Sequence, residues 1–284
     1  MARGKRCRRG RLSRRLRTQS GESCLDIPRD PLPTHVDDLP ALPSAYDAAL
    51  QPALEALESH GLAIGAEQRE AMETHIRLLL AWTEAINLTA ITDPKLIARQ
   101  HVADALAAIP ILRAGPLATL LDLGSGGGFP GLPLAICLPS TRVTLVESVR
   151  KKAAFLDVAV RAIGLSTRVT VVPVRAEALA PGRWDVVTAR AVGGLADLIE
   201  VGLPLLGVGG QLAVWKRGDL ADELATAGTA ARALGGATPT WHAYPDDVAG
   251  AAGLPDHGIV IVRKIAPSPP GYPRDPAVRR RRVW

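Results

Sequence analysis

The sequence predicts an α/β fold in which a module of helices precedes a doubly wound, mostly parallel sheet of seven strands. Three observations predict it. Between residues 117 and 265, short apolar runs alternate with longer segments of helical spacing, as in repeated βα units. Four glycines in residues 124–128 follow the first apolar run, so a buried strand turns sharply into a helix there. The last two apolar runs have only a loop between them, which predicts a final antiparallel pair.

Each element rests on a local pattern. Helices are expected at 46–59 and 67–86 from apolar spacing, and a third begins at Asp93-Pro94, a polar cap before proline, and runs through Ala108. The predicted strands are 117–123, 142–146, 168–174, 185–189, 211–216, 238–244 and 258–264. The helices between them are 130–138, 150–163, 194–206 and 220–234, and residues 245–255 are predicted to be a loop.

Composition divides the chain into four parts. Residues 1–43 are basic and then rich in proline, so we expect a disordered extension. The helical module covers 44–115 and the α/β domain 116–265. Residues 266–284 form a basic tail rich in proline and arginine, which we expect to be extended.

Charge is concentrated at the two ends of the chain. Residues 1–17 carry nine Arg or Lys and no acid, and residues 263–284 carry seven against one acid. Basic ends indicate a polyanionic partner, nucleic acid above all. The alternative is that both ends are solvated tails that keep the protein in solution.

Three cysteines, Cys7, Cys24 and Cys137, have neither CxxC nor any other metal-ligand spacing. We therefore expect no metal, and the sparse, odd count is typical of a reducing cytoplasm. The longest apolar stretch, 198–215, is interrupted by Pro204 and four glycines. We expect neither a membrane span nor a secretory signal.

The glycine turn predicts a nucleotide site, and its chemistry indicates which nucleotide. Gly126, Gly128 and Gly131 match the dinucleotide fingerprint GxGxxG. A pyrophosphate, however, needs free N–H groups in the first helical turn, and Pro130 and Pro133 have none. A nucleoside without phosphate, such as S-adenosylmethionine, loses little by this. A methyl donor, and with it a class I, Rossmann-like methyltransferase, is therefore preferred to the alternative, an NAD-dependent oxidoreductase.

The ends of the second and third strands supply candidate cofactor contacts. Glu147 ends the second strand, where a carboxylate can accept hydrogen bonds from both ribose hydroxyls. The alternative is a surface acid paired with the basic residues at 150–152. Backbone at Ala176 and Glu177 is placed to contact an adenine edge. The alternative there is an acid favoured by a helix start.

Arg190 ends the fourth strand, at the same edge of the sheet. It is expected to orient a methyl donor, or to hold an RNA phosphate or a guanine edge. The alternative is an ion pair with an acid such as Asp157 or Asp197. His101 and Asp104 share one helix face and are interpreted as a structural pair.

Two motifs are absent after the fourth strand. There is no Asn-Pro-Pro-aromatic sequence, as in methylases of exocyclic amines, and no Pro-Cys for covalent attack on a pyrimidine. A ring nitrogen such as guanine N7 has its own lone pair and needs neither a base nor a nucleophile. Alignment with the methyl group supplies most of the effect.

Several motifs together resemble the ribosomal RNA small subunit methyltransferase G family, also called glucose-inhibited division protein B. They are NLTAITDP, RQHVADA, LDLGSGGGFPGLPLAI, VTLVESVRKKAAFL, VRAEAL, VTARAV and the late Trp215-Lys216. The likeness runs from about Leu54 to Lys264. Two positions differ from the common pattern: Gly127 replaces Pro or Ala, and Ala105 replaces Ser.

The resemblance implies S-adenosylmethionine-dependent methylation of N7 of one guanine in 16S rRNA or the small ribosomal subunit. It implies donor contacts at Gly124, Gly126, Phe129, Glu147, Ala176, Glu177 and Arg190, with Arg190 positioning the reactants. Candidate RNA contacts are Asn87, Arg99, His101 and Lys216. A third hypothesis, a non-enzymatic RNA-binding protein, leaves the glycine turn and Glu147 unexplained.

Overall fold

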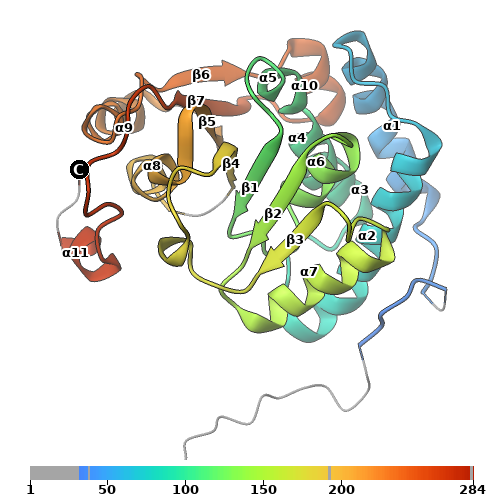
Figure 1. Ribbon diagram of the computed structural model, residues 1–284. Helices are drawn as coiled ribbons and strands as arrows, with labels where there is room; N and C mark the ends of the chain where they lie inside the picture. Colours follow the sequence, from blue (N-terminus) through green and yellow to red (C-terminus); the bar gives the residue numbers. More distant parts are fainter. Residues whose placement is uncertain (1–31, 38, 191–192, 282–283) are drawn as a thin grey trace, which may run out of the picture. The chain divides into compact units, whose positions relative to one another are not determined.

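The computed structural model describes residues 32–37, 39–190, 193–281 and 284, and the described part contains one sheet of seven strands (Figure 1). The strand order is β3-β2-β1-β4-β5-β7-β6. The strands are β1 Thr119–Leu123, β2 Arg142–Val146, β3 Val169–Val172, β4 Trp184–Ala189, β5 Leu206–Arg217, β6 Thr240–Ala243 and β7 His257–Arg263. The first five strands are parallel to one another, and β7 lies antiparallel between β5 and β6. The predicted fold class is confirmed.

The sheet is covered by helices on both faces because its strands alternate between two apolar cores. Leu120 and Val186 belong to the core under the N-terminal helices, whereas the next residues, Leu121 and Val187, belong to the opposite core. The first core also contains α6 Gly131–Cys137 and α7 Arg150–Ala162, and the second contains α8 Leu195–Gly202 and α9 Ala221–Ala233. Both faces of the sheet are buried, and its carboxyl edge carries the loops described below.

The N-terminal helices differ from the prediction in one element. Helices α1 Ser44–Ser59 and α2 Ala66–Ile86 are confirmed, but the expected third helix is interrupted. It consists of α3 Pro94–Ile97, a π-helical turn at Ala98–Ala103, α4 Asp104–Leu106 and, after a break, α5 Ile109–Leu112. Pro110, in the first turn of α5, has no N–H to donate to the carbonyl of Leu106, so the α-helical hydrogen bonding is interrupted there. The wide π turn carries His101.

The expected disordered extension, 1–43, needs a correction over its last part. Residues 1–31 lie outside the described residues. From Leu32 onward the chain runs along α2, where Trp82 Nε1 donates to the carbonyl of Pro33 at 2.8 Å and Arg77 Nε donates to that of Pro40 at 2.9 Å. The apolar side chains of Leu32, Val36, Leu39 and Leu42 pack against the core. Because a composition rich in proline is typical of disorder, the apolar residues of this segment did not predict that it packs against the core.

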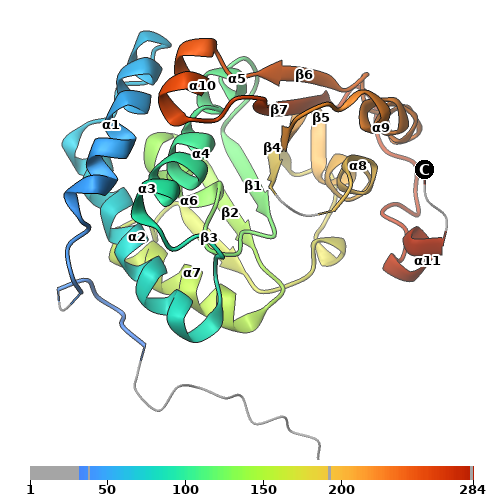
Figure 2. The ribbon, with the colours of Figure 1, turned by 180° about the vertical axis from the view of Figure 1, so that it is seen from behind.

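Two elements near the C-terminus were also not expected. Residues 245–255 contain a helix, α10 Asp246–Ala252, which packs against α1 (Figures 1 and 2). The tail was expected to be extended, but it includes α11 Pro276–Arg281, and it is tied to the body of the protein. Its anchor is Glu200, a fully buried residue of α8 whose carboxylate accepts hydrogen bonds from Arg274 and from Trp284 Nε1.

Candidate functional site

The glycine turn after β1 is held by backbone hydrogen bonds to the end of β2. The N–H groups of Gly124 and Ser125 both donate to the carbonyl of Val146 at the end of β2, at 2.9 and 3.0 Å. Gly128 has φ of +91°, and a Cβ there would lie 2.8 Å from His75 Nε2. At Gly131 a Cβ would lie 2.4 Å from Leu145. Only glycine fits these two positions, because neighbouring atoms occupy the space of any side chain.

The first turn of α6 has no N–H group left for a phosphate. The N–H of Gly131 donates to Asp122 Oδ2 at 3.2 Å, and that of Leu132 donates to the carbonyl of Gly128 at 2.7 Å. Pro133 has no N–H, and Leu134 donates within the helix. Since a pyrophosphate binds through these donors, the site fits a nucleoside rather than a dinucleotide. This argument weighs against the NAD-dependent alternative.

Asp122, near the end of β1, holds the glycine turn in place through hydrogen bonds of its side chain. Its carboxylate accepts hydrogen bonds from Thr188 Oγ1 at 2.8 Å and from the N–H of Gly131, and the residue is fully buried. Burial raises its pKa to about 6. Asp122 therefore joins β1, β4 and the start of α6 and does not face a ligand.

Glu147 lies beside the turn and is 7% exposed. Its Oε2 accepts a hydrogen bond from the N–H of Gly126 at 3.0 Å, and its Oε1 accepts one from the N–H of Val149 at 2.7 Å. Each carboxylate oxygen has a further lone pair, so the group can still accept two hydroxyl hydrogens.

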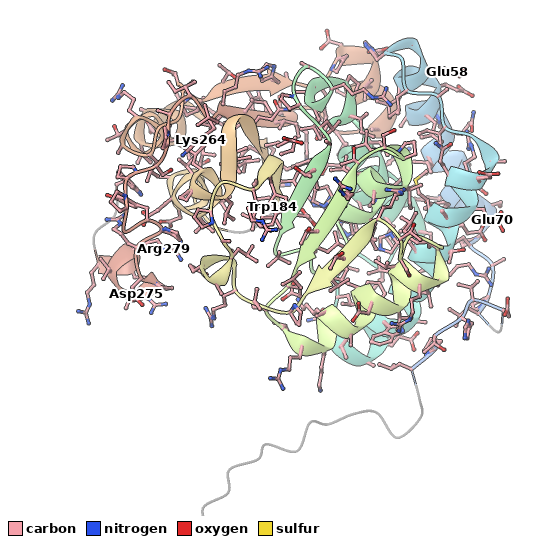
Figure 3. All side chains as sticks on the ribbon, in the orientation of Figure 1. Glu58, Glu70, Trp184, Lys264, Asp275 and Arg279 are labelled. Carbon is pink, nitrogen blue, oxygen red and sulfur yellow. The ribbon has the colours of Figure 1, made fainter. Side chains whose placement is uncertain are left out.

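A cavity of about 630 Å³, which we call the first cavity, opens at the carboxyl ends of β1 and β2. Its lining residues come from the turns after the strands, from α8 and from α11: Leu123, Gly124, Val146, Ser148, Val174, Arg175, Ala176, Glu177, Gly193, Asp197, Leu198, Val201, Pro276, Arg279 and Arg280. Three predicted cofactor residues, Gly124, Ala176 and Glu177, thus share one cavity. Arg279 of α11, labelled in Figure 3, forms an ion pair with Glu177.

Arg190 lies at the end of β4 and joins it to the helical module. Its Nη1 donates to Asp104 Oδ2 and to the carbonyl of Gln100, each at 3.1 Å, and its guanidinium lies 5.2 Å from the centre of the Phe129 ring. In the alternative considered above, Arg190 forms an ion pair with an acid such as Asp157 or Asp197. In the structure its ion-pair partner is Asp104. Arg190 therefore has a structural contact, and it also faces a second cavity described below.

Asp104 is held by more than Arg190. Tyr244 Oη donates to Asp104 Oδ1 at 2.8 Å, and Trp215 Nε1 donates to the backbone carbonyl of Asp104 at 3.0 Å. Burial raises the pKa of Asp104, while Arg190 and Tyr244 oppose that shift. Asp104 and His101 were interpreted as a pair, and Arg190 contacts both of them.

His101 packs against Phe129 with ring centres 4.6 Å apart, and His75 packs against the same ring at 4.8 Å. Burial, aided in His101 by Arg190, lowers the pKa of each to about 4. His101 is therefore neutral near pH 7. Its Nδ1 lies 3.2 Å from both Arg190 Nη2 and the carbonyl oxygen of Gln100, and its Nε2 lies 2.8 Å from Thr89 Oγ1.

The second cavity, of about 480 Å³, adjoins the first. It is lined by residues of the helical module and of the ends of β4, β5 and β7: Ile91, Gln100, His101, Asp104, Arg190, Gly193, Leu198, Trp215, Lys216, Arg217, Leu220, Glu223 and His257. Gly193 and Leu198 line both cavities. The acids facing the second cavity are each paired with a cation, Asp104 with Arg190 and Glu223 with Lys216.

The predicted residues thus fall into three groups. Gly124, Ala176 and Glu177 line the first cavity, with Gly126 and Glu147 bonded to each other beside it. His101, Arg190 and Lys216 line the second cavity, and Phe129 lies under His101 and Arg190. Asn87 and Arg99 are exposed and line neither cavity; Asn87 ends α2 in the left-handed conformation, with φ of +50°.

Sequence reasoning missed Tyr244, Glu223 and Arg279. Tyr244 and Arg279 are 140 and 102 positions from their partners Asp104 and Glu177, so no local spacing could have indicated them, whereas Glu223 lies only seven positions after Lys216. Among the described residues, no group of three or more His, Cys, Asp or Glu is arranged to hold a metal. None of the described helices has both the length and the apolarity that crossing a membrane requires.

The strand order, the glycine turn after β1 and the acid at the end of β2 define the class I, Rossmann-like methyltransferase architecture. The chain belongs to the rRNA small subunit methyltransferase G family, whose model matches residues 68–244. A relative of that name from Roseiflexus sp. (strain RS-1) is 40% identical over 234 residues, which are 81% of this chain and 97% of the relative. Another, from Limosilactobacillus reuteri (strain DSM 20016), is 36% identical over 236 residues, covering 79% and 94%.

Proposed function

We propose that this protein transfers the methyl group of S-adenosylmethionine to N7 of one guanine in 16S rRNA. The observation that supports this most directly is the pair of cavities that meet at Gly193 and Leu198 at the carboxyl edge of the sheet. One cavity fits a nucleoside donor and the other is open to a base. Family membership supports the substrate class, small-subunit rRNA.

The first cavity supplies the groups that a methyl donor needs. Glu147, beside this cavity, would accept hydrogen bonds from the ribose hydroxyls, and backbone at Ala176 and Glu177 would contact the adenine edge. Gly124 leaves room for the chain that carries the sulfonium. When bound, S-adenosylmethionine supplies an electrophilic methyl group on a sulfonium that leaves as a neutral thioether. Phe129 stacks on His101 of the helical module and Arg190 lies over the same ring, so these two residues would hold the reactants in line.

The second cavity favours a nucleophile that carries its own lone pair. Both carboxylate oxygens of Asp104 are occupied, by Tyr244 and by Arg190, and Glu223 is paired with Lys216. Asp104 is therefore not placed to take a proton from a substrate. Guanine N7 needs no base, because the N–C bond forms from its lone pair as the C–S bond breaks.

The test uses the wild-type protein with methyl-labelled S-adenosylmethionine and either small ribosomal subunits or naked 16S rRNA. Borohydride reduction and aniline cleavage then locate N7-methylguanine. We expect label in the RNA and a single new cleavage site. Label without aniline cleavage would assign the methyl group to another atom. Calorimetric titration should show binding of S-adenosylmethionine and not of NAD. Binding of NAD and not of S-adenosylmethionine would instead favour an NAD-dependent oxidoreductase. We propose that the reaction takes place in the cytoplasm.

A further inference from the structure

Lys216 and Glu223 form an ion pair on the wall of the second cavity. Lys216 Nζ, near the end of β5, lies 2.5 Å from Glu223 Oε1 in the first turn of α9. The N–H of Leu195, the first residue of α8, donates to the same oxygen at 2.7 Å. Three elements therefore fix this carboxylate. Within the described part of the chain, Glu223 Oε2 accepts no hydrogen bond that would occupy it.

Both residues of the pair line the cavity, and both side chains are partly buried. The side chains of Lys216 and Glu223 are 16% and 32% exposed. Both line the cavity that also contains Arg190, whereas the other acid there, Asp104, has Oδ1 taken by Tyr244 and Oδ2 taken by Arg190. Of the two carboxylates that face this cavity, only that of Glu223 has an oxygen available to a ligand.

A cation beside a carboxylate matches one edge of guanine. On its Watson–Crick edge, guanine presents the O6 acceptor next to two donors, N1–H and the N2 amino group. An ammonium can donate to O6, while one carboxylate oxygen with two lone pairs can accept from both N–H groups. Adenine presents a donor at position 6 and an acceptor at N1, which oppose both groups. Bases taken out of a helix are read on this edge by such hydrogen bonds.

We propose that Lys216 and Glu223 select the target base by reading the Watson–Crick edge of guanine, with Lys216 on O6 and Oε2 of Glu223 accepting from N1–H and the N2 amino group. This inference rests on the proposed function and adds its specificity residues. A guanine held by this edge has its N7, on the imidazole ring, uncovered for methyl transfer. It also explains how a cavity whose acids are paired with cations can be specific for one nucleobase.

Glu223→Gln separates base reading from a structural role. The Gln side chain still offers one oxygen to Lys216 and to the N–H of Leu195, but it places an amide donor where guanine also donates. We expect kcat/KM on small subunits to fall about tenfold or more, the range for one bidentate base contact, mainly through a higher KM. The Kd of S-adenosylmethionine and the Tm should stay as in the wild type. Asp222→Asn, an exposed neighbour on α9, is the matched control and should change nothing.

Inosine at the mapped position supplies the decisive comparison, because inosine lacks only the N2 amino group. The wild type should methylate inosine-containing subunits several-fold less efficiently than guanine-containing ones, and Glu223→Gln should discriminate less. Equal discrimination by the two enzymes would overturn the inference. If the variant unfolds at the assay temperature, the wild type alone decides, since indifference to inosine also excludes a contact to the N2 amino group. Failure of the wild type to form N7-methylguanine would instead refute the proposed function.

Discussion

At the scale of single residues, Arg190 has two roles that a variant can separate. It faces the second cavity, and it pairs with Asp104, whose side chain is only 8% exposed. Removing Arg190 leaves a buried carboxylate without its cation, which costs on the order of 3 kcal/mol. A loss of activity in Arg190→Ala must therefore be compared with a variant that restores stability without restoring the arginine.

We expect Arg190→Ala to lower both the Tm and methyl transfer. Asp104→Asn in the same chain should recover part of the Tm, because the unpaired charge is gone, but not the activity, because the positioning group is still missing. Unfolding curves and rates per folded molecule for both single variants and the double variant measure this. Recovery of activity together with Tm would show that Arg190 acts through stability alone. The pH profile of kcat/KM should keep its shape, since no titrating group is removed.

Glu147→Ala should weaken binding of S-adenosylmethionine. The ribose hydroxyls lose a charged acceptor, and a hydrogen bond to a charged group contributes about 1.5–3 kcal/mol, so a tenfold or greater rise in Kd is expected. The N–H groups of Gly126 and Val149 lose the same acceptor. Glu147→Gln, which retains one oxygen, should lose less. Calorimetry on the folded variants checks this, and an unchanged Kd would exclude a ribose contact.

His75 links pH to stability. The imidazole is fully buried, Nε2 lies 2.8 Å from the carbonyl of Gly127, and burial lowers its pKa from 6.5 to about 4. The unfolded chain thus binds more protons between these values, so stability falls as pH decreases from 6.5 to about 4, by up to ~1.4 kcal/mol per unit. His75→Gln keeps an N–H donor for Gly127 without titrating.

Denaturant unfolding across this pH range measures the effect. The slope of the unfolding free energy against pH should be smaller for His75→Gln than for the wild type. Replacing the exposed His35 by Gln is the control and should leave the slope unchanged. Parallel curves for wild type and His75→Gln would mean that His75 has the same pKa in the folded and the unfolded protein.

At the scale of elements, the C-terminal segment is a wall of the first cavity. Pro276, Arg279 and Arg280 of α11 line it, and the segment is tied down at Glu200. Burial alone would raise the pKa of Glu200, but hydrogen bonds from Arg274 and Trp284 outweigh it and hold the pKa below its usual value. The position of α11 therefore depends on a buried ion pair that lies outside the cavity.

Arg274→Ala should release this segment. Glu200 is fully buried and would lose its main partner, so we expect a loss of about 3–5 kcal/mol in the free energy of unfolding and a weaker Kd for S-adenosylmethionine. Arg281→Ala, an exposed position on the same helix, is the control. A wild-type Kd in a destabilised Arg274→Ala protein would show that α11 does not contribute to donor binding.

Elements with a strong local pattern could be predicted from the sequence, and those that depend on distant partners could not. The strand predicted at 142–146 is observed at Arg142–Val146, since alternation and turn residues fix it locally. Helix α10 has only seven residues between two prolines, and it is supported by packing on α1. The site residues, too, could be predicted where a local motif places them and not where the partner is distant in the chain. Glu147 lies beside the glycine turn as predicted, whereas Arg190 and its partner Asp104 are 86 positions apart.

At the scale of the whole molecule, the largest cluster of positive charge in the sequence is its first part. Nine Arg or Lys lie in residues 1–17, outside the described residues. If these residues contact phosphates, their effect is on affinity and its salt dependence, and not on base choice.

Replacing these nine residues by Gln should weaken binding to 16S rRNA. The slope of log K against log salt should flatten by ~0.7–0.9 for each phosphate that the basic residues no longer neutralise. The Kd of S-adenosylmethionine should not change. Filter binding at several salt concentrations measures the slope, with the unaltered chain as reference. An identical slope would mean that this end is a solvated tail.

The internal use of every N–H in the first turn of α6 has a consequence for competition inside a cell. ATP and other abundant adenine nucleotides share the adenosine part of the methyl donor, and in many enzymes their phosphates would add affinity at this helix. In this turn the phosphates find no free N–H group and must still give up hydration, so the turn itself adds no affinity for such nucleotides. An inhibitor built on adenosine gains nothing from a phosphate at this position and should extend toward Arg190 instead.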